Sequence, residues 1–294
     1  MAEDLKHITV PQGAYDLYDA YAHGRIDRRA FFAGLGKFAV GGVTIAALAG
    51  CLMPQYDVQQ TTEGEGGLDA ETAAYASPNG AGEMAGYLVR PAADTPVGGV
   101  VVIHENRGLN PHIKDVARRV AQAGYVAFAP DALYPLGGYP GTDDEGRALQ
   151  RERDRSEMVA DFMAAAEFLR AHSATTGKIG CVGFCFGGAV ANLMAVRQPW
   201  LSAAVPYYGG WPTSQEAAQV KVPLQIHLAS EDARVNAGWP PYEAALKAAG
   251  ATYEAFMYEG AQHGFHNDTT GRFDAEMAAL AWGRTLSFFE TTLA

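Results

Sequence analysis

Hydrophobic residues gather in short continuous runs along most of this chain, and longer amphipathic runs separate them. A continuous apolar run of about four to eight residues is typical of a strand buried on both faces, whereas apolar positions three and four residues apart predict a helix. The pattern predicts strands at residues 99–104, 125–129, 179–184, 203–208, 224–229 and 253–258, and helices at 114–123, 151–172, 189–196, 241–249 and 274–293.

A hairpin precedes these alternating elements. Asn79 and Gly80 stand between Tyr75 and the apolar run at 84–89, and this dipeptide favours a tight turn between antiparallel strands. Strands that alternate with helices form a mostly parallel sheet covered on both faces. We therefore expect an α/β fold whose parallel sheet is led by an antiparallel hairpin.

Residues 1–54 have a pattern of their own. Tyr15, Tyr18 and Tyr21 recur at helical spacing, and Arg28 and Arg29 precede a weakly apolar run at 30–50. Two arginines before such a run resemble a twin-arginine export signal. The alternative is an amphipathic helix lying on the main domain, because the apolar residues between positions 31 and 39 also recur at helical spacing.

The apolar run ends in Leu-Ala-Gly-Cys, which resembles a lipoprotein cleavage site with Cys51 as the lipidated residue. In that case the protein lies in the periplasm or cell envelope, and membrane contact is expected only through lipidated Cys51. In the alternative case the segment is a retained helical extension of a cytoplasmic protein. Residues 55–72 have no periodic apolar face and predict a linker, so we expect the catalytic domain at 73–294.

Composition narrows the possible functions. With 294 residues, of which 48% are hydrophobic, the chain can form one large domain with an appendage. Its net charge of -11 argues against a partner with a phosphate backbone, so nucleic acid is not expected. The three cysteines, at positions 51, 181 and 185, lack the spacing of a disulfide framework or a structural zinc site.

The stretch GFCFGG, at residues 183–188, lies between a predicted strand and a predicted helix. This context is typical of a nucleophile elbow, in which a strained central residue lifts its side chain above the sheet. The central residue is Cys185, and the positive end of the following helix would lower the pKa of its thiol and favour the thiolate. The alternative is a glycine-rich corner with a buried cysteine.

Two further residues follow later strands in the order that a nucleophile–acid–histidine triad requires. Asp232 comes directly after one predicted strand, and His263 follows the next. His263 would act as general acid and base towards Cys185, and Asp232 would fix the tautomer of His263. Glu231 is an alternative acid. A helix N-cap for Asp232 and an ordinary loop position for His263 are the non-catalytic alternatives.

The predicted oxyanion hole consists of two backbone N–H groups, one from Phe186 and one from Asn106 in the loop after the strand at 99–104. Glu105 in the same loop is either a solvated charge or a carboxylate above the thiol, and the sequence pattern alone favours the solvated charge. His263 and His266 lack an HExxH pattern, so neither a metal nor another cofactor is expected.

The combined motifs resemble those of the dienelactone hydrolase family, whose members are carboxymethylenebutenolidase-like α/β-hydrolases. HExxG after the first parallel strand, GxCxGG at the elbow, the Asp232 loop and the segment AQHGF carry the resemblance, which runs from about residue 73 to the end. The run HENRGL at 104–109 and the twin-arginine-like N-terminal segment resemble one subgroup of that family. The resemblance implies an α/β-hydrolase fold and a triad of Cys185, Asp232 and His263. It also implies that Glu105 holds the resting thiol and accepts its proton when substrate arrives.

The predicted function is hydrolysis of a carboxylic ester or a lactone by a cysteine nucleophile. Members that cleave dienelactone carry a basic residue shortly after the catalytic histidine, whereas this chain has His266 and Asn267 there. Neutral esters and other lactones are therefore alternative substrates. A promiscuous short-chain or aryl esterase and a non-catalytic binding protein on a hydrolase scaffold are the alternative functions, and the oligomeric state is left open. The predicted substrate-binding residues are Arg107, Tyr134, Trp211, Phe265 and His266.

Overall fold

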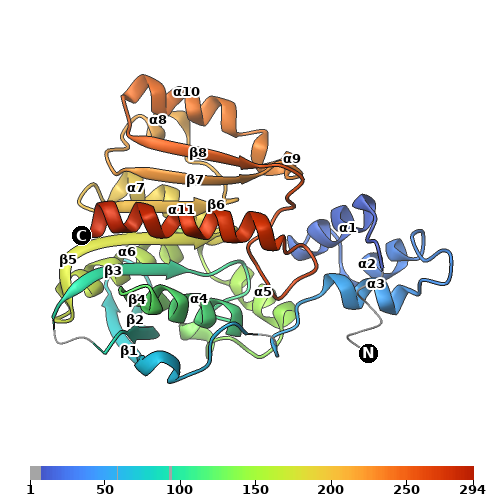
Figure 1. The fold of residues 1–294 in the computed structure, drawn as a ribbon, viewed down its shortest axis with the longest axis horizontal. Helices are drawn as coiled ribbons and strands as arrows, with labels where there is room; N and C mark the ends of the chain where they lie inside the picture. Colours follow the sequence, from blue (N-terminus) through green and yellow to red (C-terminus); the bar gives the residue numbers. More distant parts are fainter. Residues whose placement is uncertain (1–7, 58, 93–94) are drawn as a thin grey trace.

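An eight-stranded sheet forms the centre of the computed structural model, which describes residues 8–57, 59–92 and 95–294 (Figure 1). The strands lie in the order β1-β2-β4-β3-β5-β6-β7-β8. β2 is antiparallel to both of its neighbours, and all other neighbouring strands are parallel. The predicted parallel sheet with a leading hairpin is therefore confirmed. The strands are β1 (Asp69–Ser77), β2 (Gly82–Arg90), β3 (Val97–Ile103), β4 (Val126–Pro130), β5 (Thr175–Phe184), β6 (Ala203–Tyr207), β7 (Leu224–Ala229) and β8 (Tyr253–Tyr258).

Helices cover both faces of this sheet. α4 and α11 pack on one face, and α6, α7 and α10 pack on the other (Figure 1). The α-helices are α1 (Gln12–Ala22), α2 (Arg28–Leu35), α3 (Ile45–Leu52), α4 (Pro111–Gln122), α5 (Asp143–Glu152), α6 (Arg155–Ala171), α7 (Phe186–Arg197), α8 (Ser214–Ala217), α9 (Ala233–Asn236), α10 (Trp239–Ala249) and α11 (Ala275–Leu293). Two short 3-10 turns are η1 (Glu65–Gly67) and η2 (Tyr134–Leu136).

Two hydrophobic cores lie on the two faces of the sheet. In β3, Val100 and Val102 belong to the core under α4 and α11, and Val101 and Ile103 belong to the core under α6 and α7. Because alternate residues of a strand point to opposite faces, a strand with a helix layer on each side buries all of its side chains. This explains why the central strands are continuous apolar runs in the sequence.

The single helix predicted at 151–172 is wrong, because the structure divides this region between α5 and α6. Asp154 has an extended backbone (φ -64°, ψ 129°), and its carboxylate accepts hydrogen bonds from the backbone N–H groups of Ser156 and Glu157. An aspartate in this position satisfies the first N–H groups of a helix, so α6 begins anew after the break. α5 has its own N-cap at Thr142.

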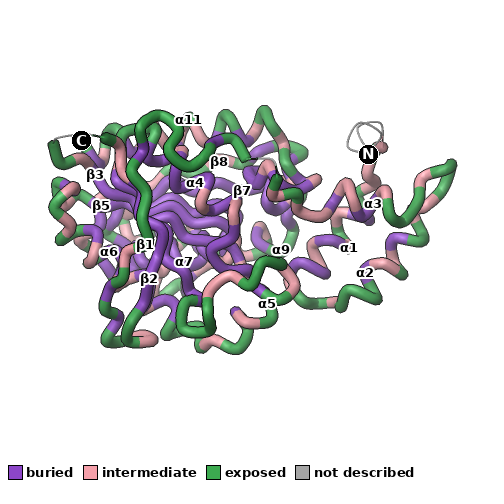
Figure 2. The backbone as a smooth tube through the Cα atoms, turned by 90° about the horizontal axis from the view of Figure 1, so that it is seen from below, coloured by how far each residue is buried: buried purple, intermediate pink, exposed green. Residues whose placement is uncertain are grey.

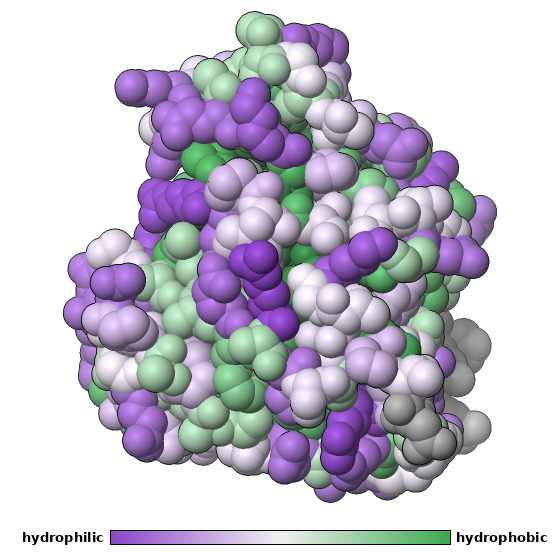
Figure 3. All heavy atoms as spheres, turned by 90° about the vertical axis from the view of Figure 1, so that its left-hand side faces the viewer, coloured by the Kyte–Doolittle hydropathy of each residue, from purple (hydrophilic) through white to green (hydrophobic). Residues whose placement is uncertain are grey.

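α1, α2 and α3 form a small cluster of their own beyond the strand ends to which the arrows point in Figure 1. The cluster projects from the body in the second view (Figure 2), and the face that points away from it mixes hydrophilic and hydrophobic residues (Figure 3). No helix in the described part of the chain is long and apolar enough to cross a membrane. The buried residues of the cluster are Ala14, Tyr18, Tyr21, Ala22, Phe31, Leu35, Leu48, Ala49 and Leu52.

Polar contacts join these helices to the body. Asp144 on α5 accepts hydrogen bonds from the Tyr21 hydroxyl and from Arg28 Nη1, the latter at 2.9 Å. Asn106 Nδ2 donates to the carbonyl oxygen of Ala22 at 2.7 Å. The end of α1 is therefore fixed to the loop that follows β3.

The described residues of the segment predicted as a linker, 55–72, contact the body at Thr61. Thr61 is buried, and its backbone N–H donates to Asp115 Oδ1 at 2.8 Å. β1 begins within this segment, at Asp69. The domain boundaries themselves stay a prediction.

Candidate active site

The turn between β5 and α7 holds Cys185 in a strained conformation, with φ 57° and ψ -108°. A positive φ is unfavourable for a residue with a Cβ and occurs where the surroundings enforce it. The glycines around Cys185 allow the close approach that does so. A Cβ on Gly183 would lie 2.0 Å from the carbonyl oxygen of Gly187, and one on Gly188 would lie 2.5 Å from that of Tyr207. The elbow geometry expected from the sequence is present.

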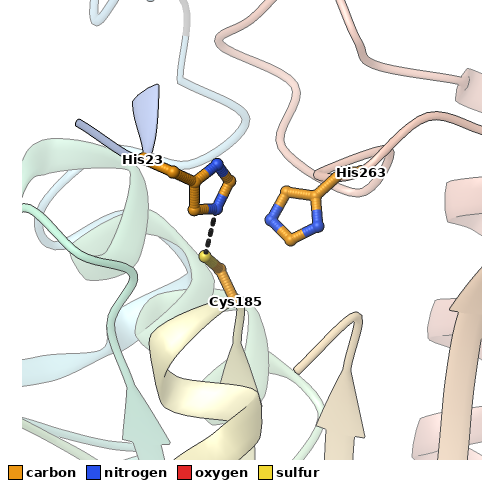
Figure 4. Close-up of side chains that lie close together, drawn as sticks. All are labelled: His23, Cys185 and His263. Carbon is orange, nitrogen blue, oxygen red and sulfur yellow. Dashed lines mark hydrogen bonds between the residues drawn. The ribbon is translucent and has the colours of Figure 1, made fainter. Parts of the chain in front are cut away.

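Asp232 and His263 meet beside this elbow. Asp232 is the residue before α9, and its Oδ2 lies 2.5 Å from Nδ1 of His263, in the loop after β8. Asp232 Oδ1 also accepts the backbone N–H of Val235, so it caps α9 as well as binding the histidine. The carboxylate keeps a proton on Nδ1 and leaves the other ring nitrogen for Cys185, beside which the ring lies (Figure 4).

A second histidine, which the sequence analysis missed, contacts the same thiol. His23 directly follows α1, and its Nε2 lies 3.4 Å from Cys185 Sγ (Figure 4). Its Nδ1 lies 2.8 Å from the carbonyl oxygen of Asp19 and 3.1 Å from the carboxylate of Asp19. The rings of His23 and His263 are 4.8 Å apart between centroids. Two aspartate–histidine pairs therefore face one sulfur.

Arg234 on α9 lies between the two histidines. Its Nη2 is 3.1 Å from His23 Nε2 and 3.3 Å from His263 Nδ1. Arg272 pairs with Asp19 across 3.4 Å. The carboxylate of Asp19 thus pairs with His23, four residues away, and with Arg272, which comes from a distant part of the chain.

The charges around Cys185 favour its thiolate. Burial raises the pKa of the Cys185 thiol, but the positive charges of His263 and His23 lower it to about 5. Burial lowers the pKa of His263, whereas Asp232 and the Cys185 thiolate raise it to about 9. Burial also opposes the charged form of His23, and Cys185 and Asp19 outweigh it, so the pKa of His23 lies above its ordinary value. A thiolate and an imidazolium therefore coexist around neutral pH.

Glu105 is buried beneath the site, with 1% of its surface exposed. Its carboxylate pairs with Arg107 at 3.3 Å and accepts a hydrogen bond from Asn267 Nδ2 at 2.9 Å. Burial raises the pKa of Glu105, but the charges of Arg107 and of a nearby histidine lower it to about 2. The solvated alternative for Glu105 is therefore wrong. The side-chain hydrogen bond of Cys185 Sγ is formed with His23 Nε2.

The two residues predicted for the oxyanion hole lie close to the elbow. Phe186 is the first residue of α7, and the first N–H groups of a helix have no acceptor within it. The side chain of Asn106 is used for contact with α1, which leaves the predicted role of its backbone N–H unaffected.

The residues predicted to line the substrate pocket differ in how deeply they are buried. Arg107 is buried in ion pairs with Glu105 and with Asp143, the latter at 2.5 Å. Phe265 and His266 are also buried, and the His266 ring stacks on Phe184 at 5.1 Å between centroids. This packing favours structural positions for Arg107, Phe265 and His266 over the pocket lining that the sequence suggested.

Trp211 and Tyr134 lie nearer the surface. Trp211 Nε1 donates to the carbonyl oxygen of Val235 at 2.8 Å, next to the Asp232 loop. Tyr134 is 38% exposed and lines a cavity of about 650 Å³, whose lining includes Lys114 and Arg118 but not Cys185. Tyr134 is thus not brought to the thiol.

Tyr208, the residue directly after β6, is a further residue that the sequence did not single out. It has a positive φ of 36°, and its ring centroid is 5.0 Å from that of His263. Its buried hydroxyl has no hydrogen-bond partner among the described residues. An unusual backbone conformation and a buried hydroxyl without a partner are typical of functional sites.

The donor atoms of His23, Cys185 and His263 lie within 4.8 Å of one another, the one such group found among the described residues. Two imidazoles and a thiolate suit a cation such as zinc. However, the guanidinium of Arg234 is 3.1 Å from His23 Nε2, and its positive charge opposes a cation at that nitrogen. The arrangement suits acid–base chemistry at sulfur better than metal binding.

Comparisons with known proteins identify the family of this chain. The model of the dienelactone hydrolase family matches residues 84–293, and a model described as YqhI-like matches residues 1–40. A predicted carboxymethylenebutenolidase of Synechocystis sp. is 32% identical over 245 residues, which cover 77% of this chain and 99% of that protein. A predicted hydrolase fragment of Escherichia coli, YghX, is 54% identical over 116 residues, which cover 38% of this chain and 97% of the fragment.

Solved structures support the fold. The crystal structure of a predicted dienelactone hydrolase from Klebsiella pneumoniae superposes with a TM-score of 0.66 at 28% identity, covering 76% of this chain and 99% of that one. The α/β-hydrolase fold expected from the sequence is therefore confirmed.

Proposed function

Because this chain belongs to the dienelactone hydrolase family, we propose that it hydrolyses carboxylic esters or lactones with Cys185 as the nucleophile and Asp232–His263 as the acid–base pair. One observation carries the proposal: the strained Cys185 thiol and the Asp232-bound ring of His263 lie together at the carboxyl edge of the sheet. Nucleophile, base and orienting acid are the three groups that acyl transfer requires.

In the first half-reaction the Cys185 thiolate attacks the carbonyl carbon of the substrate. The backbone N–H groups of Phe186 and Asn106 stabilise the negative oxygen that forms. The carbon–oxygen bond to the leaving group then breaks, and His263 gives its proton to the departing oxygen. The product of this half-reaction is a thioester on Cys185.

In the second half-reaction a water attacks the thioester while a neutral imidazole takes one of its protons. With a single histidine, that imidazole is His263. The carbon–sulfur bond breaks, its electron pair returns to Cys185 as thiolate, and the carboxylic acid leaves. Glu105, ionised and buried nearby, favours the positive charge on His263.

The surroundings of Asn267 bear on the choice of substrate. Its side chain donates to Glu105, so it brings no positive charge for a substrate carboxylate. We therefore propose neutral esters and lactones as substrates. A thiolate attacks activated esters and strained lactones most readily, so these should be hydrolysed faster than simple alkyl esters.

The N-terminal helices are part of the proposed enzyme. They bury their own core, and His23 reaches the catalytic thiol. These contacts support a retained segment over an export signal. Whether this chain shares the twin-arginine-like character of a family subgroup stays a prediction.

Hydrolysis of p-nitrophenyl acetate and of a dienelactone by the wild type and by Cys185→Ala tests the proposal. We expect the variant to lose about 10³-fold or more in kcat, since it lacks the nucleophile. Cys181→Ala is the matched control, because this buried thiol lies within β5, four residues before Cys185.

The outcomes separate the candidate functions. Loss of both activities in Cys185→Ala supports the thiol hydrolase. Hydrolysis of the simple ester alone by the wild type would favour the short-chain esterase. Equal activity of wild type and Cys185→Ala would contradict the proposal and favour a scaffold without a catalytic thiol.

A further inference from the structure

We infer that His23, oriented by Asp19, is a second catalytic histidine that takes the proton of the attacking water when the Cys185 thioester is hydrolysed. The inference rests on the proposed function and extends it, because it adds a base from the N-terminal segment to the triad.

The two histidines face Cys185 in equivalent ways. Asp232 binds Nδ1 of His263, and Asp19 binds Nδ1 of His23 through its carbonyl oxygen and its carboxylate. A proton held on Nδ1 leaves a lone pair on Nε2 that can accept a proton, and in the resting structure Arg234 Nη2 lies 3.1 Å from this nitrogen. Nε2 of His23 lies 3.4 Å from the sulfur, so it also lies beside the carbonyl of any acyl group bound there.

A purely structural role explains only half of these contacts. His23 caps the end of α1, where a histidine interacts favourably with the last carbonyl groups, and this accounts for the bond to the Asp19 carbonyl. It does not account for Nε2 on the nucleophile. Contacts of Arg272 with Asp19 and of Asn106 with Ala22 hold the end of α1 in this place.

Nearby charges favour different protonation states for the two histidines. The rings are 4.8 Å apart, and two imidazolium ions at this distance repel each other, so one proton is favoured for the pair. Burial lowers the pKa of His263, but Asp232 and the thiolate raise it, so the proton resides on His263, which then protonates the leaving group. Burial lowers the pKa of His23, and the Cys185 thiolate and Asp19 raise it above its ordinary value in the resting enzyme. The thiolate charge disappears when the thioester forms, and a guanidinium has donors but no acceptor, so Arg234 beside Nε2 then favours neutral His23, the base. The charged groups facing His23 are Asp19, Arg234, Cys185 and His263, with Arg25 and Arg272 paired to Asp19.

The step balances without a further reactant. The oxygen of water bonds to the thioester carbon, and one of its protons passes to His23 Nε2. The carbon–sulfur bond breaks, and its electron pair restores the Cys185 thiolate. His23 then passes the proton to His263, which had lost its own to the leaving group, and both return to their resting states.

Burst kinetics of His23→Asn with p-nitrophenyl acetate test this assignment. We expect the steady-state rate to fall by about 10²–10⁴-fold, as for loss of a general base, while a burst of p-nitrophenol persists and acetylated protein accumulates in the mass spectrum. His263→Asn should instead lose the burst. Asp16→Asn, on the exposed side of α1, is the matched control and should behave as wild type.

Imidazole rescue separates catalysis from folding. His23→Ala, with unchanged circular dichroism, should regain steady-state turnover in added imidazole, because a small base can fill the space beside the thioester. Asp19→Asn should slow the steady state less than His23→Asn does. A structural defect would not respond to imidazole, and absence of rescue would overturn the inference.

Other outcomes identify which proposal fails. An unchanged steady-state rate in His23→Asn, with Cys185→Ala inactive, would overturn the role of His23 and leave the proposed function intact. A faster rate would also overturn it, because α1 would then obstruct the site. Full activity of Cys185→Ala would remove the proposed function itself.

Discussion

At the scale of single residues, the reactivity of Cys185 depends on its two imidazole neighbours. Each is held by an aspartate, and together they outweigh the burial that would otherwise keep the thiol protonated. The sulfur is therefore ionised at a pH where an ordinary thiol, with a pKa of about 8.5, is not.

This predicts a bell-shaped pH profile of kcat/KM for p-nitrophenyl acetate. Below about 5 the Cys185 thiolate takes up a proton and the nucleophile is lost. Above about 9 His263 loses its proton and cannot protonate the leaving group. Initial rates between these limits, corrected for the uncatalysed reaction, should form a plateau. A single rise near pH 8.5 would show an unperturbed thiol and contradict the pairing.

The sequence predicted the positions of Cys185, Asp232 and His263, because the elbow motif and the order of strands place them at one sheet edge. It could not predict His23, which is 162 residues from Cys185 and reaches it through the docking of α1. One local signal existed: Asp19 and His23 are one helical turn apart on a predicted helix. Such pairs are common on surfaces, so the signal has meaning only once the fold is known.

At the scale of elements, the β5–α7 junction depends on glycines at close approach. Gly183→Ala should lower the free energy of unfolding by roughly 1–3 kcal/mol, because its Cβ would meet the Gly187 carbonyl and force the backbone to move. The same movement should displace Cys185 and lower kcat. Urea unfolding and ester hydrolysis measure the two effects.

Gly210→Ala is the control for this prediction. A Cβ there would lie 3.7 Å from the Cβ of Ala189, an ordinary contact, so both stability and kcat should stay near the wild-type values. Equal losses in Gly183→Ala and Gly210→Ala would contradict the close-approach argument.

The strands were predicted well because burial on both faces makes them continuous apolar runs. Helix boundaries were predicted less well. The break between α5 and α6 depends on the Asp154 side chain, which accepts hydrogen bonds from the backbone N–H groups two and three residues later. This interrupts an apolar pattern that otherwise suits one long helix. The signal, an aspartate followed by serine and glutamate, was present in the sequence but competed with a strong apolar periodicity.

At the scale of the whole molecule, Asp144 connects the N-terminal cluster to the body. It binds Tyr21 of α1 and Arg28 of α2 from α5. Asp144→Ala should weaken the docking of the N-terminal helices on the body by about 1–2 kcal/mol. The fraction of molecules in which these helices are detached should then rise by about 5–30-fold. Trypsin should then cleave after Arg25 or Arg28 faster by that factor while the sheet domain unfolds at nearly the same temperature.

Glu152→Ala, an exposed change on the same helix, is the control and should leave the cleavage rate unchanged. If Asp144→Ala is cleaved no faster than this control, the polar contacts contribute nothing to docking, and the apolar packing of α1 alone would hold the cluster.

The separation of the site's parts along the chain has a consequence for biosynthesis. A ribosome that has released residues 1–200 has made Cys185 and His23 but neither Asp232 nor His263. Contacts between distant segments form late, once the loops between them have closed. The nascent polypeptide therefore carries an ordinary thiol, and a nucleophilic thiolate emerges after the remaining strands have been translated and the two ends of the chain have met.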